Sequence, residues 1–354
     1  MTSTAQASAT QRAANGFITV GLNALLVGVA VFYCLGRADG GQMSTLSAPW
    51  ALQCWLAFVA ILVMGMLFGR WRTSLAASLL TLWSGLVVVP SVLPQPTVHA
   101  RDTFSSPVRA MSINVNLRNA PSPYALQWIR NERPDVLALI EMSTPWREAM
   151  AGLADDFPYA YTLPDSATAR GIGLYSRYPI VDALKETTCL ECQPLIEASI
   201  EHPLGLVRVF AIHPLSPMND ERTQWRDAEL RLIAERCAAV NVPTMVLGDF
   251  NETPYGSAFQ DFLKQTGYTA ARSVEGFSPT WPAQHDGILI PSVFRIPIDH
   301  IVVSPHFNAL AFEVGPPIGS DHLPIVAQLG LVSMGDQPRA TTRAAVGTSR
   351  SHNP

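Results

Sequence analysis

Residues that can bind a metal ion or transfer a proton stand at the ends of several short apolar runs in the chain. They comprise two histidines, four carboxylates and three asparagines: His213, His322, Glu141, Asp249, Asp299, Asp321, Asn114, Asn116 and Asn251. Oxygen ligands with few histidines and no cysteine suit Mg²⁺ or Mn²⁺ rather than zinc. A histidine beside such ligands can take a proton from water near neutral pH. Together these residues indicate metal-assisted hydrolysis.

The spacing of these residues adds to the signal. Asn114 and Asn116 are two residues apart, so in a strand both side chains face the same way. Asp249 and Asn251 repeat this spacing, and Gly248 before them lets the backbone approach a neighbour closely.

Single residues of the set have alternative readings. Glu141 ends the apolar run VLALI, where a carboxylate either caps the next helix or binds a metal ion, although Ser143 and Thr144 offer caps of their own. A lone histidine after a strand, such as His213, is more often structural. Asp299 lies inside an apolar run, where a carboxylate is costly unless it has a partner.

The elements that position these residues are short apolar runs rich in β-branched residues, separated in places by helical patterns. The runs are 109–115, 136–140, 172–175, 207–212, 244–247, 300–303 and 325–329. Residues 220–240 form the longest helical pattern, with Trp225, Leu230, Leu232, Ile233 and Cys237 near one stripe. Strands that alternate with helices predict an α/β domain. The chain has no Gly-rich P-loop and no G-x-S-x-G motif, which argues against nucleotide hydrolysis of that kind and against serine esterase chemistry.

The N-terminal part of the chain has a different composition. Residues 16–35, 50–69 and 74–93 lack Asp, Glu, Lys and Arg, and each run is long enough to cross a bilayer. A signal peptide followed by buried helices is the alternative, but a signal peptide has a single, shorter apolar core. We therefore predict a cytoplasmic N-terminus at 1–15, three transmembrane helices within 16–93, a linker at 94–107, a catalytic domain at 108–333 and a disordered tail at 334–354.

The orientation in the membrane follows from the flanking cations. Arg12 precedes the first run, and Arg70 and Arg72 lie between the second and third. The positive-inside rule then places both segments in the cytoplasm. With three spans, the domain lies on the periplasmic or extracellular side of the inner (plasma) membrane. In that oxidising compartment Cys189 and Cys192 are disulfide candidates, with a two-cysteine zinc half-site as the alternative.

The order of these motifs resembles the endonuclease/exonuclease/phosphatase superfamily, which has the DNase I-like fold. The signature elements stand here as INVNLR, LIEMS, GIGLYSRYPI, IHP, GDFNETP, IDHIVVS and SDHLPIV, and they cover about residues 101–330. The resemblance implies a four-layer α/β sandwich. Its active site would lie at one edge of the two packed sheets.

The resemblance also implies a role for each residue. Glu141 and Asn114 would form the metal site, assisted by Asn116 or Asp321. His322 would be the general base, oriented by Asp299. The remaining members act on the water and the phosphate: Asp249 aligns the water, and Asn251 and His213 bind the phosphate and stabilise its transition state. The sequence departs from the pattern at Asn116, where many relatives carry Asp.

The substrate class is narrowed by charge and by the predicted tether. Between Arg101 and Gly330 the sequence has 17 Lys and Arg against 26 Asp and Glu, a net charge of −9, whereas duplex-binding nucleases usually present a basic surface. The chain resembles bacterial members with three N-terminal spans, some of which are linked to phosphate removal from isoprenoid lipid carriers. The segment FSPTWP at 277–282 also resembles that subgroup, and Trp281 either walls the substrate cleft or packs within a loop.

Three hypotheses follow from the sequence. The first is an outer-face hydrolase of a lipid-linked (isoprenoid or phospholipid) or other small phosphoester, held at the lipid bilayer. The second is a membrane-tethered nuclease acting on DNA or RNA, which the charge disfavours. The third is a catalytically silent binding module, which the intact catalytic set disfavours.

Overall fold

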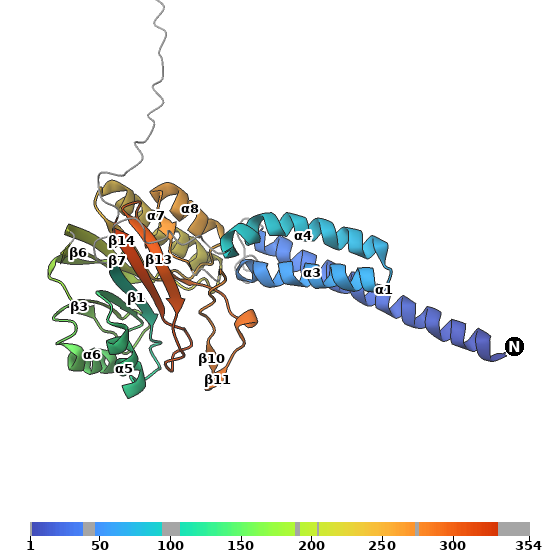
Figure 1. The fold of residues 1–354 in the computed structure, drawn as a ribbon, viewed down its shortest axis with the longest axis horizontal. Coiled ribbons are helices and arrows are strands. Elements are labelled where there is room, and N and C mark those ends of the chain that lie inside the picture. Colours follow the sequence, from blue (N-terminus) through green and yellow to red (C-terminus); the bar gives the residue numbers. More distant parts are fainter. Residues whose placement is uncertain are drawn as a thin grey trace, which may run out of the picture.

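The computed structural model describes residues 2–37, 47–93, 107–187, 192–203, 205–272 and 276–331. They form an α/β domain from which a bundle of N-terminal helices extends on one side (Figure 1). Nearly all of the predicted linker, the whole predicted tail and Cys189 lie outside the described residues.

Two six-stranded sheets form the centre of the domain. The first has the order β13-β14-β1-β2-β4-β3, and the second has the order β5-β6-β7-β8-β12-β9. The strands of the first sheet are, in that order, Phe307–Val314, Ile325–Leu331, Val108–Asn114, Val136–Ile140, Ile172–Ser176 and Tyr159–Leu163. Those of the second sheet are Ile180–Thr187, Pro194–His202, Gly205–Ile212, Thr244–Asp249, Asp299–Val303 and Thr269–Ala270.

Each sheet contains one parallel pair of strands, β1 with β2 and β7 with β8, and its other pairs are antiparallel. A parallel pair needs a crossover connection, and a helix supplies it in each sheet. The helix α5 (Pro123–Glu132) joins β1 to β2, and α7 (Asp220–Ala239) joins β7 to β8. Ser122 caps α5 by accepting the Ala125 N–H at 3.1 Å, and Asn219 caps α7 in the same way.

Alternation along the strands divides the core into layers. Alternate residues such as Ala110 and Met245 face the other sheet and form the central apolar layer. The opposite faces pack against helices: β1 and β2 against α5 and α6 (Thr144–Met150), and β7, β8 and β12 against α7 and α8 (Ser257–Thr266). The predicted four-layer α/β sandwich is therefore confirmed.

The described residues of the N-terminal part form the apolar helices α1 (Thr2–Arg37), α3 (Ala51–Leu67) and α4 (Trp71–Val92). Within the described residues, two segments are long and apolar enough to cross a membrane by length and composition, Ala14–Gly36 and Trp71–Ser91. The helix α3 has 17 residues and falls short of that length. The structure thus supports two of the three predicted spans, because the apolar run at 50–69 begins in the 3₁₀ turn η1 (Ala48–Trp50) and ends in a turn at Phe68.

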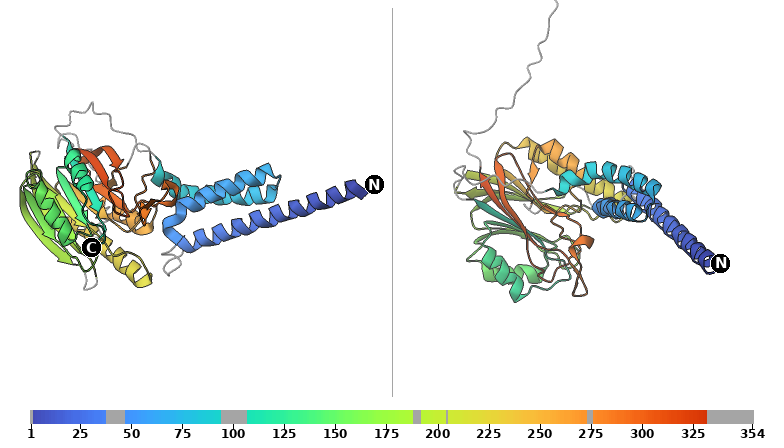
Figure 2. Two further views of the ribbon diagram at one scale, coloured as in Figure 1. Left: turned by 90° about the horizontal axis from the view of Figure 1, so that it is seen from below. Right: turned by 45° about the vertical axis from the view of Figure 1, so that its right-hand side comes forward.

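The bundle is joined to the α/β domain at the domain-side ends of α3 and α4. Gln53 Nε2 donates to the carbonyl oxygens of Val293 and Arg295, at 3.2 Å each. Tyr255 Oη donates to the Pro49 carbonyl at 2.7 Å, and Arg272 donates to the Pro90 carbonyl at 3.1 Å. The start of α3 and the end of α4 therefore lie at the same face of the domain, as the views in Figure 2 also show.

Two details of the sequence prediction are wrong. Trp225 and Leu232 are only half-buried on α7, whose buried face includes Arg226, Glu229 and Leu230. The prediction also omits several strands, mostly at sheet edges: β3, β5, β6, β9, β13 and the hairpin β10 (Gln284–His285) with β11 (Ile288–Leu289).

Candidate active site

The carboxyl ends of both parallel pairs meet at one edge of the two sheets. Asn114 ends β1 and Glu141 follows β2, while His213 follows β7 and Asp249 ends β8. Asp299 begins the antiparallel neighbour β12 and lies opposite Asp249 in the register. On β8 and β12 these carboxylates continue the alternation that turns Met245 and Ile301 toward the central layer.

His322 and Asp299 form a buried pair. Nδ1 of His322 lies 2.9 Å from Oδ2 of Asp299, and only 5% and 3% of the two residues is exposed. The buried Ser320 hydroxyl accepts the His322 backbone N–H at 3.0 Å and donates to the Asn114 carbonyl at 2.7 Å. The carboxylate orients the ring from one side, so Nε2 is left to face the rest of the site.

Asn114 lies at the centre of the site. Its Nδ2 group is 3.2 Å from Glu141 Oε1, 3.1 Å from Asp249 Oδ2 and 3.4 Å from His322 Nε2. Its Oδ1 accepts the Asn116 backbone N–H at 3.0 Å. In this conformation the amide nitrogen faces Glu141, so ligation of a cation by Asn114 would require its oxygen to turn inward.

Three residues of the site adopt left-handed backbone conformations: Asn116 at φ 57°, Glu141 at φ 58° and Asn251 at φ 49°. Such conformations are strained in residues other than glycine, and they concentrate at functional sites. They also end the strand alternation, so the predicted shared faces of Asn114 with Asn116 and of Asp249 with Asn251 are wrong. Each pair is instead a tight turn in which the first side chain accepts the backbone N–H of the second.

The side chain of Glu141 is turned into the site rather than onto a helix. Its Oε2 accepts the Leu117 N–H at 3.1 Å, and its Oε1 contacts Asn114. The following helix α6 starts at Thr144, with Ser143 at its N-cap. The helix-capping alternative for Glu141 is therefore not found.

Asp321 lies at the outer end of the site, and its carboxylate accepts hydrogen bonds from two neutral donors. Asn116 Nδ2 donates to Oδ1 at 2.6 Å, and Trp281 Nε1 donates to Oδ2 at 3.1 Å. The Trp281 ring is 6.3 Å from that of His322, measured between centroids. Trp281 therefore lies against the site, and it also lines the adjoining cleft.

His213 and Asn251 occupy the side of the second sheet. His213 Nε2 lies 3.7 Å from Asp249 Oδ2 and 3.9 Å from Glu141 Oε1. Asn251 Nδ2 donates to the Pro214 carbonyl at 3.0 Å, which leaves one of its two N–H bonds available. Gly248 approaches its neighbour as closely as predicted, since a Cβ there would lie 1.9 Å from the Ile212 carbonyl oxygen.

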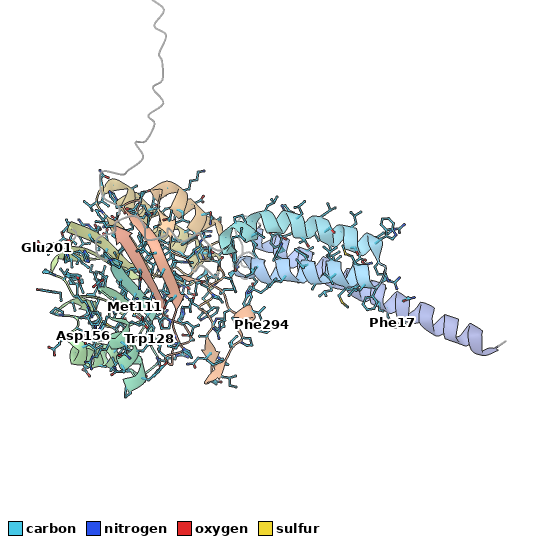
Figure 3. The ribbon with its side chains drawn as sticks, in the orientation of Figure 1. Phe17, Met111, Trp128, Asp156, Glu201 and Phe294 are labelled. Atoms are coloured by element: carbon cyan, nitrogen blue, oxygen red, sulfur yellow. The ribbon has the colours of Figure 1, made fainter. Side chains whose placement is uncertain are left out.

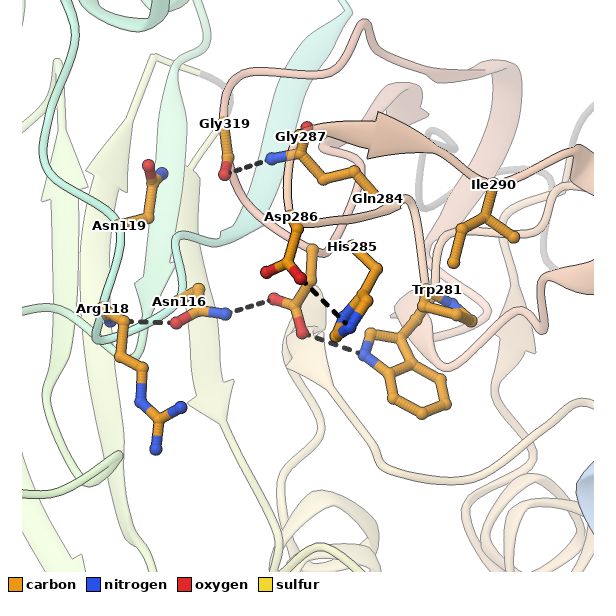
Figure 4. Close-up of a pocket in the computed structure, with 12 residues that line it drawn as sticks. Asn116, Arg118, Asn119, Trp281, Gln284, His285, Asp286, Gly287, Ile290 and Gly319 are labelled. Atoms are coloured by element: carbon orange, nitrogen blue, oxygen red, sulfur yellow. Dashed lines mark hydrogen bonds and ion pairs between the residues drawn. The ribbon is translucent and has the colours of Figure 1, made fainter.

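A cleft of about 620 Å³ opens beside Asn116 and Asp321. Figure 4 shows Trp281, Gln284 and Ile290 around it, with Arg118 on the opposite wall. The hairpin β10–β11 forms one side of the cleft. The catalytic groups are thus buried at one end of an open and mainly polar groove.

Burial and charge shift the pKa values of two groups. Burial, together with the charge of Asp299, raises the pKa of Asp249 to about 6, although His322 and His213 act in the opposite direction. Burial lowers the pKa of His322, but the charges of Asp299 and Asp249 outweigh it and raise that pKa to about 10. A cation bound beside the surrounding carboxylates would lower this pKa, so that Nε2 can accept a proton.

The donor set fits a divalent cation. Among the described residues, Asp249, Asp299, Glu141 and Asp321 make their hydrogen bonds and ion pairs with amides, an indole and histidines, and none with Lys or Arg. Asp249, Asp299 and His322 also offer ligand atoms within 4.8 Å of one another. Because His322 and Asp299 already bond each other, Glu141 and Asp321 are the other carboxylates of the site that could hold the cation.

The family model for the endonuclease/exonuclease/phosphatase family matches residues 111–322. The chain belongs to this family. It is accordingly a hydrolase of phosphoester bonds, and members of the family typically depend on divalent metal ions. No curated protein sequence matches the chain.

Solved structures show the same fold. An endonuclease/exonuclease/phosphatase from Beutenbergia cavernae matches with a TM-score of 0.53 and 23% identity over 64% of this chain and 72% of that one. TDP2 from D. rerio, complexed with a single-strand DNA product, matches at 0.51 with 15% identity over 64% of this chain and 100% of its own. The 3′ phosphatase NExo from Neisseria, bound to a product DNA hairpin, matches at 0.50 with 20% identity over 62% and 98%.

The structure adds residues that the sequence analysis did not assign. Ser320 is the first residue of the SDH motif, and its position directly before Asp321 and His322 could have identified it as a site residue. Arg226 stands among acidic residues on α7, which is typical of an exposed side chain, but it is buried and donates to the Asn251 carbonyl at 2.8 Å. It also pairs with the buried Glu252 at 2.9 Å, so it supports the turn that carries Asn251.

Cys192 is disulfide-bonded, whereas Cys34, Cys54 and Cys237 are free. The predicted partner, Cys189, lies outside the described residues, so the proposed pairing stays a prediction.

Proposed function

We propose that this chain is a membrane-anchored, metal-dependent phosphoesterase that hydrolyses a lipid-linked or other small phosphoester at the outer face of the membrane. One observation carries the proposal. The domain with the buried His322–Asp299 pair and its open cleft is hydrogen-bonded directly to the ends of apolar helices.

In this proposal His322 is the general base. Asp299 fixes the Nδ1–H tautomer, so the unprotonated Nε2 faces the site and accepts a proton from the attacking water. Asp249 Oδ2, 3.7 Å from Nε2, aligns that water. The phosphate is held by the free N–H of Asn251 and by His213, whose Nε2 lies toward Asp249 and Glu141.

Mg²⁺ or Mn²⁺ would be held by Glu141 and Asp321, assisted by the side-chain oxygens of Asn114 and Asn116. When bound, the ion supplies positive charge that offsets the negative charge of the phosphate and its transition state. Asn116 donates to Asp321, and the backbone N–H of the next residue, Leu117, donates to Glu141, so this turn contacts both carboxylates.

The substrate class follows from charge and tethering. Residues 101–330 have a net charge of −9, whereas duplex-binding proteins usually present a basic surface. A site joined to membrane helices meets lipid head groups at a high effective concentration. Trp281, on the cleft wall, contributes an apolar surface beside the phosphate site.

The membrane topology is part of the proposal. The start of α3 and the end of α4 both adjoin the domain, so the Arg70–Trp71 turn and the start of α1 lie at the other end of the bundle (Figure 1). We propose three passes, with α3 as the third, and the flanking cations Arg12, Arg70 and Arg72 then give a cytoplasmic N-terminus and an external domain at 108–333. An alkaline phosphatase fusion at Gly330 should be active, because that reporter works only after export. An inactive fusion, with an active cytoplasmic reporter at the same position, would reverse the topology.

The proposed function is tested by a substrate panel on the full chain in detergent or vesicles. The panel contains a prenyl phosphate, bis-p-nitrophenyl phosphate, plasmid DNA and RNA, each with Mg²⁺ and with EDTA. We expect Mg²⁺-dependent release from the first two substrates. Cleavage confined to DNA or RNA would assign the chain to tethered nucleases, and inactivity on every substrate would favour a silent binding module.

A further inference from the structure

The segment between the cleft and the helix bundle exposes an unusual concentration of apolar side chains. Ten large hydrophobic residues of the described α/β domain are exposed, and four of them lie within residues 288–294. We call these four the apolar rim: Ile288 at 73%, Leu289 at 54%, Val293 at 46% and Phe294 at 58% exposure. The other six are spread over residues 124–218.

The rim adjoins the start of α3. Its second half is the 3₁₀ turn η3 (Ser292–Phe294), and Gln53 on α3 donates to the carbonyls on both sides of Phe294. Figure 3 shows Phe294 on the side of the domain that faces the helices. Val293 and Phe294 therefore lie beside the start of α3, and Ile288 and Leu289 continue the rim onto the hairpin β10–β11.

The length of α3 indicates where the boundary of the bilayer core passes the bundle. Its 17 residues span about 25 Å at 1.5 Å per residue, whereas a bilayer core is about 30 Å thick. The missing ~5 Å corresponds to the three residues of η1 at about 2 Å each. If α1 and α4 span the core, its boundary passes through η1 and close to η3, which is hydrogen-bonded to Gln53 in the first turn of α3.

A groove in the bundle supports the same conclusion. A cavity of about 480 Å³ between α1 and α3 is lined mainly by apolar residues, including Leu25, Phe32 and Trp50. Gln53 lines it as well and so connects this groove to η3. An open apolar groove at this level suits a lipid chain, and Trp is favoured at membrane interfaces.

We propose that the apolar rim inserts into the interface of the bilayer and holds the cleft open toward a phosphoester whose lipid chain stays in the membrane. This inference rests on the proposed membrane anchoring and makes the substrate class specific. Ile290 connects the two parts, because it lies between Leu289 and Ser292 and lines the cleft. A head group then reaches Asp321 along the β10–β11 hairpin while its chain remains among lipids.

The test uses the full chain in phospholipid vesicles with p-benzoylphenylalanine at position 294. After irradiation, mass spectrometry should find phospholipid adducts on the peptide that carries position 294. The matched control carries the same group at Val181, which is 50% exposed on β5. Figure 1 places β6, the neighbour of β5, on the side away from the helices, so position 181 should give no lipid adduct.

Absence of a lipid adduct at 294, or equal adducts at both positions, would overturn the proposal. A crosslinked dimer without lipid would assign the rim to a second copy of the chain and would also overturn it. A lipid adduct in a protein that hydrolyses no lipid phosphoester would uphold the membrane contact and refute the proposed function.

The double variant Val293→Ser/Phe294→Ser provides a second measurement. It should lower hydrolysis of vesicle-borne prenyl phosphate by roughly tenfold, about 1.4 kcal/mol, and leave hydrolysis of soluble bis-p-nitrophenyl phosphate unchanged. Equal losses on both substrates would count against an orienting role for the rim.

Discussion

The His322–Asp299 pair makes a quantitative prediction. If Asp299 acts only through His322, the variants Asp299→Asn, His322→Ala and their combination should affect the same step. Loss of a general base typically costs about 10²–10⁴ in rate, so His322→Ala should reduce kcat by that amount.

The distance between the two groups sets the expected effect of Asp299→Asn. Two unit charges 2.9 Å apart interact by about 6 kcal/mol at an effective dielectric constant of about 20. The net contribution of a hydrogen bond to a charged group is smaller, about 1.5–3 kcal/mol. At about 1.36 kcal/mol per tenfold, Asp299→Asn should therefore slow turnover by roughly 10- to 150-fold.

The assay is Mg²⁺-dependent hydrolysis of bis-p-nitrophenyl phosphate by the full chain in detergent. Independent effects would multiply to roughly 10³–10⁶ in the double variant, whereas a shared step leaves it within a few-fold of His322→Ala alone. His306→Ala is the matched control, because His306 lies beyond the other end of β12 and contacts Ser304. Multiplicative losses would refute the pairing of Asp299 with His322.

Three further predictions concern metal binding, the support of the site and pH. Glu141→Gln should raise the Mg²⁺ concentration needed for half-maximal rate and remove most activity, because an amide supplies no charge to the ion; full activity in excess EDTA would contradict this. Arg226→Met should lower the free energy of unfolding by about 3–5 kcal/mol, since it leaves the Glu252 carboxylate buried and unpaired. The exposed Arg231→Met on the same helix serves as control, and equal effects on thermal unfolding would reject the argument. Burial raises the Glu229 pKa from 4.5 to about 7, so the folded state holds this proton more tightly than the unfolded chain. The free energy of unfolding should then fall by roughly 3 kcal/mol as the pH rises from about 4.5 to about 7, and Glu229→Gln should flatten that profile.

The central strands could be predicted from the sequence because both of their faces are buried. β2 is a continuous apolar run and β8 contains one at its centre, and burial extends along the whole length of both strands. The edge strand β5 alternates poorly and is mostly exposed, so its residues carry no comparable signal. Its partner β6 is the next strand in the chain, but β5 has no fully buried residue that would mark it as a strand.

The site residues could be located from strand ends, but their geometry could not. Strand alternation assigned Asn116 to the face of Asn114, whereas the chain turns into a left-handed conformation at Asn116. Arg226 was hidden for a related reason, since an arginine among acidic residues on a helix looks exposed until its partner Glu252 is brought against it by the fold.

The most direct test of the account is phosphate release from a prenyl phosphate embedded in vesicles that contain the full chain. We predict release that requires Mg²⁺, stops with EDTA and falls by about 10²–10⁴ in His322→Ala. Plasmid DNA added to the same vesicles should remain intact. Degradation of the DNA with no release of lipid phosphate would contradict the account.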